Sequence, residues 1–144
     1  MTNNWIYQGH EITDISQTPK DSVGFCYKIT NLQDGRYYVG RKILYNNKRT
    51  VISKRIKKAT GTRKKYNSVT VESDWASYFG SCAELHSDRK VIQDQYWKRE
   101  ILEFCYSKRQ LNYKETWWQF KLNVLEEYTY NGSILGRYYK DRLI

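Results

Sequence analysis

Proline, histidine and paired cysteines are scarce in this sequence. Its 144 residues contain one proline, eight glycines, two histidines and three cysteines. So little proline and glycine excludes a linker-dominated or disordered chain. No CxxC pair occurs, and the histidines do not pair with the cysteines at zinc-like spacing. We therefore expect free thiols, with Cys26 and Cys105 buried inside apolar runs, which suits a reducing cytoplasm.

Long apolar runs are also missing. None approaches the roughly 18 residues of a membrane-spanning helix, so we expect no membrane partner. The segment 1–5 has neither a charged start nor an apolar core, which predicts that no signal peptide is present and that the protein is cytoplasmic. The length fits a single domain, 1–144, with one core. We divide it into a loosely packed lead-in at 1–22, with one short strand expected at residues 5–7, a core at 23–125 and a tail at 126–144.

Acidic residues are absent from position 36 to position 71. The formal net charge is +10, from 25 Lys and Arg against 15 Asp and Glu. Eleven of the cations lie within this acid-free stretch between positions 41 and 65: Arg41, Lys42, Lys48, Arg49, Lys54, Arg55, Lys57, Lys58, Arg63, Lys64 and Lys65. A solvated loop, a localisation tract or an acidic-lipid patch would also use such a run. The density of cations in this run favours contact with nucleic acid.

Two apolar-aromatic runs before the basic segment predict a β-hairpin. The runs 23–30 and 36–42 flank the turn-prone residues 31–35. Alternation with a period of two predicts one strand face made of Val23, Phe25, Tyr27 and Ile29. The hairpin would bring the phenols of Tyr27 and Tyr38 beside Arg41 and Lys42. A phenol has a pKa of about 10 and acts as a base only where cations or a metal lower that pKa.

Downstream patterns predict a third strand and three helical segments. Residues 97–106 read as the strand, and 109–126 as the clearest helix. A second helix is expected to begin at Ser73 or Asp74, with an apolar stripe of Trp75, Tyr78 and Phe79. One or two further helical turns are expected over 82–89, and a turn at Asn131 and Gly132.

Glu115 is exceptional within the helix expected at 109–126. It shares one face with Leu111, Trp118 and Leu122. A carboxylate among apolar residues is unfavourable unless it is paired with a cation or binds a metal. Both alternatives are open on the sequence alone.

The ordered set of these residues resembles the GIY-YIG nuclease superfamily. It comprises residues 24–27 (Gly-Phe-Cys-Tyr), Tyr38-Val39-Gly40 eleven residues past Tyr27, the strand ending at 101–103, and Glu115 in a helix. The likeness covers roughly 23–125 and is closest to small phage-encoded members, including the homing type. Residues 72–81 also look like a stretch common in phage members.

The resemblance implies an α+β fold with a small three-stranded antiparallel sheet flanked by helices, here with a basic insertion at 41–66 after the second strand. It implies hydrolysis of a DNA phosphodiester, by nicking or double-strand cutting, with one Mg²⁺ or Mn²⁺ ion. Glu115 would bind the metal, Tyr27 would activate or orient the water, and Tyr38 would lie near the phosphate. The partner would be double-stranded DNA, in the host cytoplasm for a phage protein, with a homodimer possible.

Several positions depart from the family pattern. Two residues, instead of one, separate Gly24 from Tyr27 in the first motif. The family arginine that stabilises charge on the phosphate matches several cations, namely Arg41, Lys42, Arg49 and Arg55. The late family asparagine matches Asn123, Asn131 or neither. A non-catalytic nucleic-acid-binding protein on the same scaffold is therefore the alternative, in which the basic run would bind and Glu115 would be structural.

Overall fold

A five-stranded mixed sheet forms the centre of the computed structural model, which describes residues 3–143. The strand order is β2-β1-β7-β3-β4. The strands span β1 Trp5–Tyr7, β2 His10–Ile12, β3 Gly24–Asn31, β4 Tyr37–Ile43 and β7 Trp97–Cys105. β3 pairs antiparallel with both β4 and β7, as the hairpin and third-strand predictions require. The prediction of three strands is wrong, because β1 pairs parallel with β7 and β2 extends the sheet beyond it.

The additional strands come from the N-terminal segment, where β1 confirms the short strand expected at residues 5–7 and β2 was not predicted. The segment is anchored through Trp5. This side chain is fully buried, and its ring lies 5.0 Å from that of Phe25, edge to face. Its indole nitrogen donates a hydrogen bond of 2.7 Å to the carbonyl of Trp75. A buried tryptophan contributes a large apolar area and needs a partner for its N–H, and both conditions are met here. The expectation of a loosely packed lead-in is therefore wrong at Trp5.

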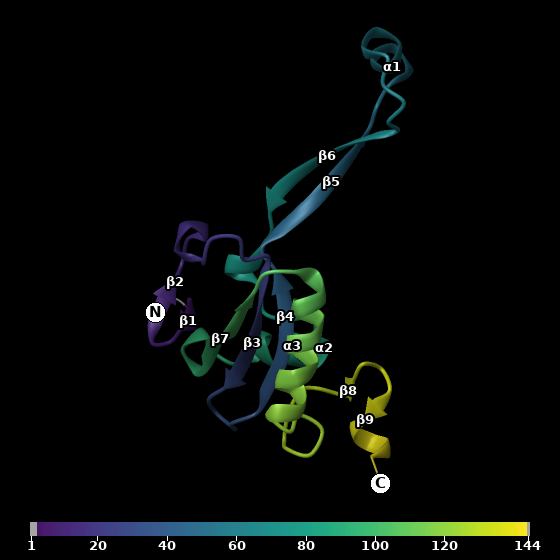
Figure 1. Cartoon of the computed structure of the whole chain (residues 1–144). Helices are drawn as coiled ribbons and strands as arrows, with labels where there is room; N and C mark the ends of the chain where they lie inside the picture. Colours follow the sequence, from purple (N-terminus) through teal and green to yellow (C-terminus); the bar gives the residue numbers. More distant parts are fainter. Residues whose placement is uncertain (1–2, 144) are drawn as a thin grey trace.

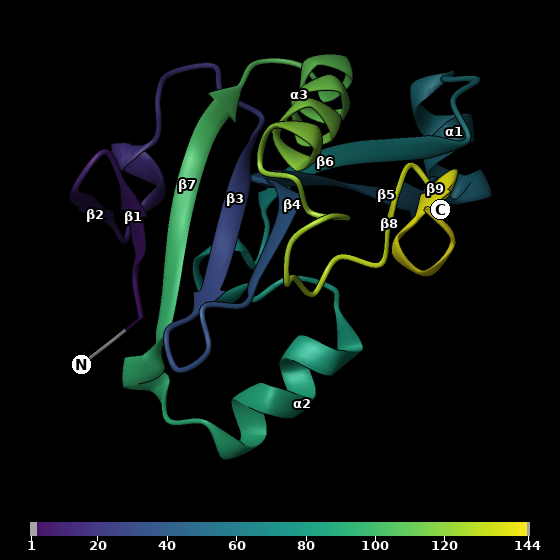
Figure 2. The same cartoon turned by 90° about the horizontal axis from the view of Figure 1, so that it is seen from below.

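Two helices cover opposite faces of the sheet, as Figure 2 shows. α2 (Ala83–Val91) lies on the side of a core cluster that includes Trp5, Tyr27 and Leu85. α3 (Lys108–Lys121) lies on the other side, where Cys26, Cys105 and Leu111 pack together. Cys26 and Cys105 are buried free thiols, as predicted. The helix ends before position 126 because Asn123 adopts a left-handed conformation with φ of 52°.

Residues 73–81 form a loop and not the predicted helix. Only one 3₁₀ turn is present, η2 (Trp75–Ser77), after which Tyr78 is extended. Trp75 and Phe79 are buried in the core, so their apolar pattern reflects packing and not helical periodicity. The other 3₁₀ turns are η1 (Ile15–Gln17), η3 (Asp94–Tyr96) and η4 (Lys140–Arg142).

The C-terminal segment closes part of the exposed edge of β4. Asn131 is buried, and its side-chain amide accepts a hydrogen bond from the Val39 N–H and donates one to the Val39 carbonyl, at 3.0 and 2.9 Å. The turn predicted at Asn131 and Gly132 is wrong. The turn lies instead at 135–137, between β8 (Ser133–Ile134) and β9 (Tyr138–Tyr139).

The basic segment projects from the rest of the molecule as an arm, which we define as residues 45–72 (Figure 1). It consists of β5 (Tyr45–Val51), α1 (Lys54–Thr60) and β6 (Tyr66–Glu72), with β5 and β6 paired antiparallel. Among residues 3–143, no helix is long and apolar enough to cross a bilayer.

Candidate active site

The β3–β4 hairpin brings Tyr27 and Tyr38 together near the edge of the sheet. Tyr27 pairs with Gly40, and Tyr38 pairs with Ile29, so both tyrosines lie on the face that α2 covers. Their ring centroids are 6.2 Å apart. β4 is the last strand of the sheet, so a side chain that reaches across it can meet solvent or a ligand.

Gly40 makes it possible for Tyr27 to reach across β4. A Cβ atom at this position would lie 2.6 Å from the hydroxyl oxygen of Tyr27, closer than any real side chain tolerates. Gly80 also approaches this oxygen, and a Cβ there would lie 3.3 Å away. Gly80 has φ of +83°, a conformation that favours glycine. The phenol oxygen of Tyr27 therefore lies close to two glycine backbones.

The loop that follows β6 supplies two further hydroxyl groups. The ring of Tyr78 packs edge to face on that of Tyr27, with centroids 5.9 Å apart. The Ser81 hydroxyl lies 3.2 Å from the hydroxyl of Tyr38, within hydrogen-bond distance. The sequence patterns assign neither residue to a site. The likeness of residues 72–81 to phage members is the only signal in the sequence that points to this loop.

Arg41 and Glu115 approach from the α3 face. Arg41 pairs with Cys26 in the sheet, on the face opposite to Tyr27, and Glu115 lies in the middle of α3. The guanidinium Nη1 of Arg41 donates to Oε1 of Glu115 at 2.8 Å. The side chain of Glu115 is 20% exposed and that of Arg41 is 45% exposed, so both groups are accessible to a ligand. Glu115 is thus paired with a cation in this state of the protein.

The groups described above line one cavity of about 260 Å³ at the edge of the sheet. Its lining residues are Tyr27, Tyr38, Arg41, Tyr78, Ser81 and Glu115. They come from β3, β4, α3 and the loop at 73–81. Four of the predicted site residues therefore meet in one place, although Glu115 is separated from Tyr27 by most of the chain.

Burial keeps both motif phenols neutral. It raises the pKa of Tyr27 well above the usual value of 10.0, and the neighbouring phenols of Tyr38 and Tyr78 raise it further. Burial also raises the pKa of Tyr38. Burial, and not the field of the adjacent cations, therefore sets the direction of the pKa change in both phenols, and Arg41 is itself paired with Glu115.

Lys42 does not line the cavity. It follows Arg41 in the strand and so lies on the other face, where its ammonium is 2.5 Å from Oδ1 of Asp74. The same ammonium lies 4.0 Å from the centre of the Tyr78 ring. The hydrogen bond from Lys42 lowers the pKa of the Asp74 carboxyl. Lys42 therefore contacts the loop around Tyr78 without lining the cavity.

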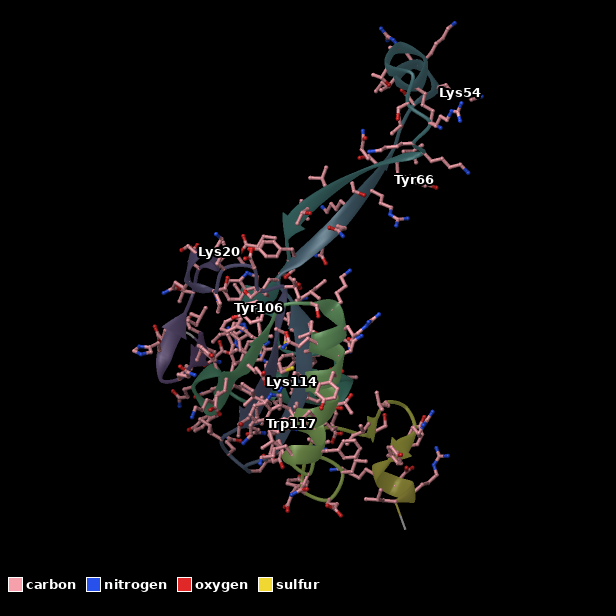
Figure 3. The ribbon with its side chains drawn as sticks, viewed as in Figure 1. Lys20, Lys54, Tyr66, Tyr106, Lys114 and Trp117 are labelled. Carbon is pink, nitrogen blue, oxygen red and sulfur yellow. The ribbon has the colours of Figure 1, made fainter. Side chains whose placement is uncertain are left out.

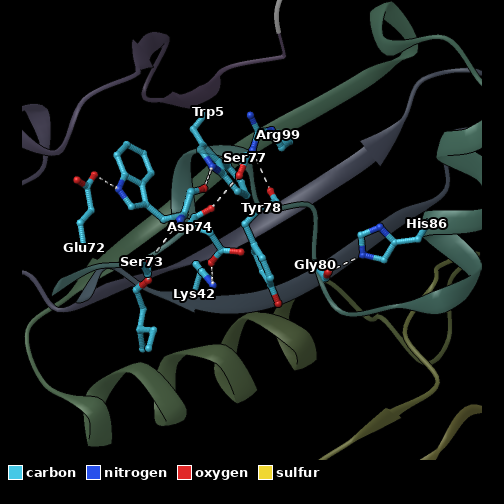
Figure 4. Close-up of polar contacts among 12 residues, drawn as sticks. Trp5, Lys42, Glu72, Ser73, Asp74, Ser77, Tyr78, Gly80, His86 and Arg99 are labelled. Carbon is cyan, nitrogen blue, oxygen red and sulfur yellow. Dashed lines mark hydrogen bonds and ion pairs between the residues drawn. The ribbon is translucent and has the colours of Figure 1, made fainter. Parts of the chain in front are cut away.

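A set of polar contacts fixes this loop against the sheet (Figure 4). Arg99, which is buried in β7, donates to the carbonyls of Ala76 and Tyr78 at 3.0 and 2.8 Å. The hydroxyl of Ser73 donates to the carbonyl of Ile43 at 2.6 Å. An imidazole nitrogen of His86 lies 2.7 Å from the carbonyl of Gly80. These contacts hold the cavity wall in place.

The remaining predicted cations lie in the arm and not at the cavity. Figure 3 shows side chains extending into solvent around Lys54 and Tyr66. Among the candidates for the phosphate-stabilising cation, Arg49 and Arg55 belong to β5 and α1, so only Arg41 lines the cavity. Of the two candidate asparagines, Asn131 contacts the second motif strand at Val39.

Among the described residues, Glu115 is the single carboxylate that lines the cavity. Among residues 3–143, no group of three or more His, Cys, Asp or Glu side chains could hold a metal ion together. Mg²⁺ commonly binds one or two carboxylates and completes its shell with water and substrate phosphate oxygens. The donors present therefore fit an ion shared with a phosphate, and do not fit one held by protein ligands alone.

A comparison with protein families agrees with this geometry. Residues 5–143 match the family described as "Putative endonuclease segE, GIY-YIG domain". No curated protein and no solved structure matches the chain. The match covers nearly the whole chain, including the β3–β4 hairpin, the loop at 73–81 and α3. The chain therefore belongs to the SegE family of GIY-YIG endonucleases.

Proposed function

We propose that the protein hydrolyses phosphodiester bonds of double-stranded DNA with the help of one divalent metal ion, Mg²⁺ or Mn²⁺. The observation that carries this proposal is the convergence of Tyr27, Tyr38, Arg41 and Glu115 on one cavity at an open sheet edge. A phosphate placed there meets a cation, a carboxylate and hydroxyl groups at once.

Glu115 would hold the ion, because no other carboxylate of residues 3–143 lines the cavity. When bound, such an ion supplies positive charge that stabilises the phosphate and the leaving oxygen. Arg41 is now paired with Glu115, and its planar guanidinium suits a phosphate equally well. DNA binding would transfer this guanidinium from the carboxylate to the phosphate, where it offsets charge developing in the transition state.

Tyr27 would act as a neutral hydroxyl that orients the attacking water. Burial and the two glycine backbones restrict the position of its oxygen, and its raised pKa keeps the proton in place. A neutral phenol both donates and accepts hydrogen bonds, so it can fix the direction of a water molecule. Tyr38, within hydrogen-bond distance of Ser81, would contact the phosphate or its water shell.

Glu115→Gln tests this assignment on supercoiled plasmid with Mg²⁺ or Mn²⁺. The amide keeps the size of the side chain and removes the charge, so we expect cleavage to fall by about 10³-fold or more. Glu126→Gln, at an exposed position after α3, is the matched control and should cleave like wild type. A chelator should stop cleavage by wild type. Relaxed circles would indicate nicking, and linear products double-strand cutting.

Two outcomes would contradict the proposal in different ways. If Glu115→Gln cleaves as fast as wild type, Glu115 does not hold the ion. If wild type binds plasmid but cleaves none with either metal, the non-catalytic alternative is correct. In that case binding would survive Glu115→Gln and would weaken with salt.

A further inference from the structure

The arm buries almost nothing, so packing does not account for its presence. Every residue of β5 is exposed, and β6 has a single half-buried residue, Val71. At the tip, Ile52 is buried and α1 has no buried residue. A two-stranded hairpin is marginally stable by itself in water. A segment that adds nothing to the core and projects this far is expected to serve a partner (Figure 1).

The charge of the arm identifies the kind of partner. Its single acidic residue is Glu72, at the base, which accepts a hydrogen bond from the Trp75 indole at 2.8 Å. Its nine cations are Lys48, Arg49, Lys54, Arg55, Lys57, Lys58, Arg63, Lys64 and Lys65. Such a density without acidic neighbours complements a polyanion.

The arm has two parts that differ in chemistry, a ribbon formed by β5 and β6 and a tip formed by residues 52–65. Seven of the nine cations lie within residues 54–65, on α1 and the segment that follows it. The β5–β6 ribbon carries only the other two, Lys48 and Arg49. Long, flexible cations suit phosphates, which carry no sequence information. The chemistry of the tip therefore suits contacts with phosphates.

The ribbon presents hydrogen-bonding side chains on both faces. Pairing places Asn47 and Arg49 on one face with Thr70 and Ser68, and Asn46, Lys48 and Thr50 on the other with Val71, Val69 and Asn67. Asn, Arg, Lys, Ser and Thr are the residue types that read base edges in DNA. The major groove is wide enough to admit a two-stranded ribbon. Hydrogen-bonding side chains on both faces suit a groove, whose two walls a ribbon can contact at once.

The base of the ribbon is fixed to β4, the strand that carries Tyr38 and Arg41. Leu44 alone separates β4 from β5, and it is fully buried. Its N–H donates to the carbonyl of Val23 at 2.9 Å, and its carbonyl accepts from the N–H of Ser73 at 2.8 Å. Seven strand residues extend about 23 Å at roughly 3.3 Å each, about two-thirds of a DNA turn of roughly 34 Å.

We propose that the arm reads duplex DNA, with the β5–β6 ribbon in the major groove and the tip on flanking phosphates, and thereby sets where the enzyme cuts. The claim about cut position rests on the proposed endonuclease function, whereas the claim about binding does not. The sequence read by the ribbon lies within about one helical turn of the cut, on one side of it.

Two variants of the full chain separate the two parts of the arm. The tip variant carries Lys54→Gln, Arg55→Gln, Lys57→Gln and Lys58→Gln. Its control removes four exposed cations of the core, with Lys20→Gln, Lys90→Gln, Lys98→Gln and Arg137→Gln. The ribbon variant carries Asn46→Ala and Asn67→Ala, which spare the hydrogen bond between Thr70 and Asn47 that joins the strands. Its control is Gln93→Ala with Gln95→Ala, both exposed on the core.

Binding to plasmid fragments is measured without metal over a range of salt, and cut positions are mapped with metal on the same DNA. For the tip variant we expect the slope of log K against log salt to fall by about 3 to 4, at about 0.9 for each phosphate that the protein no longer neutralises, with the same cut positions. For the ribbon variant we expect an unchanged slope and a preference among cut sites reduced about tenfold or more. Both controls should match wild type.

The results that would overturn the proposal are distinct from failure of the proposed function. An unchanged salt slope in the tip variant, or unchanged cut-site preference in the ribbon variant, overturns it. So does wild-type cleavage without any site preference, or binding of structured RNA or anionic vesicles as tight as binding of duplex DNA. If wild type cuts nothing but its metal-free binding responds to the tip variant as expected, the endonuclease function and the claim about cut position fail while DNA binding by the arm stands.

Discussion

The core and the arm differ in how their side chains are held. In the core, each catalytic candidate is held in place by its neighbours: Tyr27 against two glycines, Glu115 on a packed helix and Tyr78 by the buried Arg99. In the arm, nearly every side chain is exposed. Bond cleavage requires groups fixed to within a fraction of an ångström, which only packing provides. Binding to a polyanion needs charge density, which an exposed segment supplies without a core of its own.

Arg99→Met should have the largest effect, because it removes the donor that joins the loop to the sheet. Arg99 donates to the carbonyls of Asn3, Ala76 and Tyr78. These three hydrogen bonds are part-buried, and a carbonyl left without a donor costs about 1 kcal/mol or more, so the free energy of unfolding should fall by roughly 3–5 kcal/mol. Urea denaturation measures this, with Lys98→Met, an exposed neighbour in β7, as control. Equal stabilities would show that packing alone holds the loop.

Gly40→Ala tests whether cleavage depends on the packed position of the Tyr27 phenol. The new methyl group would lie 2.6 Å from the Tyr27 oxygen, so the phenol has to move. We expect cleavage to fall by about 10²-fold, and the free energy of unfolding by about 1–3 kcal/mol. Gly132→Ala is the matched control, because nothing lies within 4 Å of a Cβ there. Wild-type activity in Gly40→Ala would show that the position of the phenol does not matter for cleavage.

Alkaline pH should destabilise the core through its buried tyrosines. Burial raises the pKa of Tyr27 above 10.0 in the folded protein, whereas the unfolded chain releases this proton near pH 10. Above that pH the unfolded state binds fewer protons, so the free energy of unfolding decreases as pH rises. The slope is at most about 1.4 kcal/mol per pH unit for each such tyrosine. Denaturation of wild type and Tyr27→Phe between about pH 9 and pH 11 measures this, and Tyr27→Phe should fall less steeply.

Removal of the arm should have the smallest effect on stability. Tyr45 and Glu72 face each other at its base, so an Asn-Gly turn can replace residues 46–71. Because the removed residues bury little apolar area, the free energy of unfolding should change by less than about 0.5 kcal/mol. Thermal and urea denaturation check this on the shortened chain. A loss of more than about 1 kcal/mol would show that the arm also supports the core.

The hairpin, the third strand and α3 follow from local patterns, and the structure confirms them within a few residues, apart from the end of α3. Alternation of apolar residues predicts a strand from neighbours along the chain alone. The same approach fails at 73–81, where Trp75 and Phe79 mimic a helical stripe. Their burial is imposed by Trp5 and Arg99, which are distant in the sequence. No local pattern contains that information.

The candidate site also divides into residues that the sequence indicates and residues that only contacts between distant segments bring in. The resemblance to the GIY-YIG superfamily is what singles out Tyr27, Tyr38 and Glu115 in the sequence, and the three residues line one cavity in the structure. The choice of Arg41 from four candidate cations depends on its contact with Glu115 at 2.8 Å and on the location of Arg49 and Arg55 in the arm. Tyr78 and Ser81 join the site only when the loop is folded against the hairpin.

By itself, the sequence determined the residue types of the site, the order of the main elements and the concentration of positive charge between positions 36 and 71. Those properties depend on neighbours along the chain. Only the tertiary structure decided that the sheet has five strands, that Tyr27 is a buried neutral phenol, and that the basic segment stands away from the core. These properties depend on burial and on contacts between distant residues, because desolvation and packing act through space.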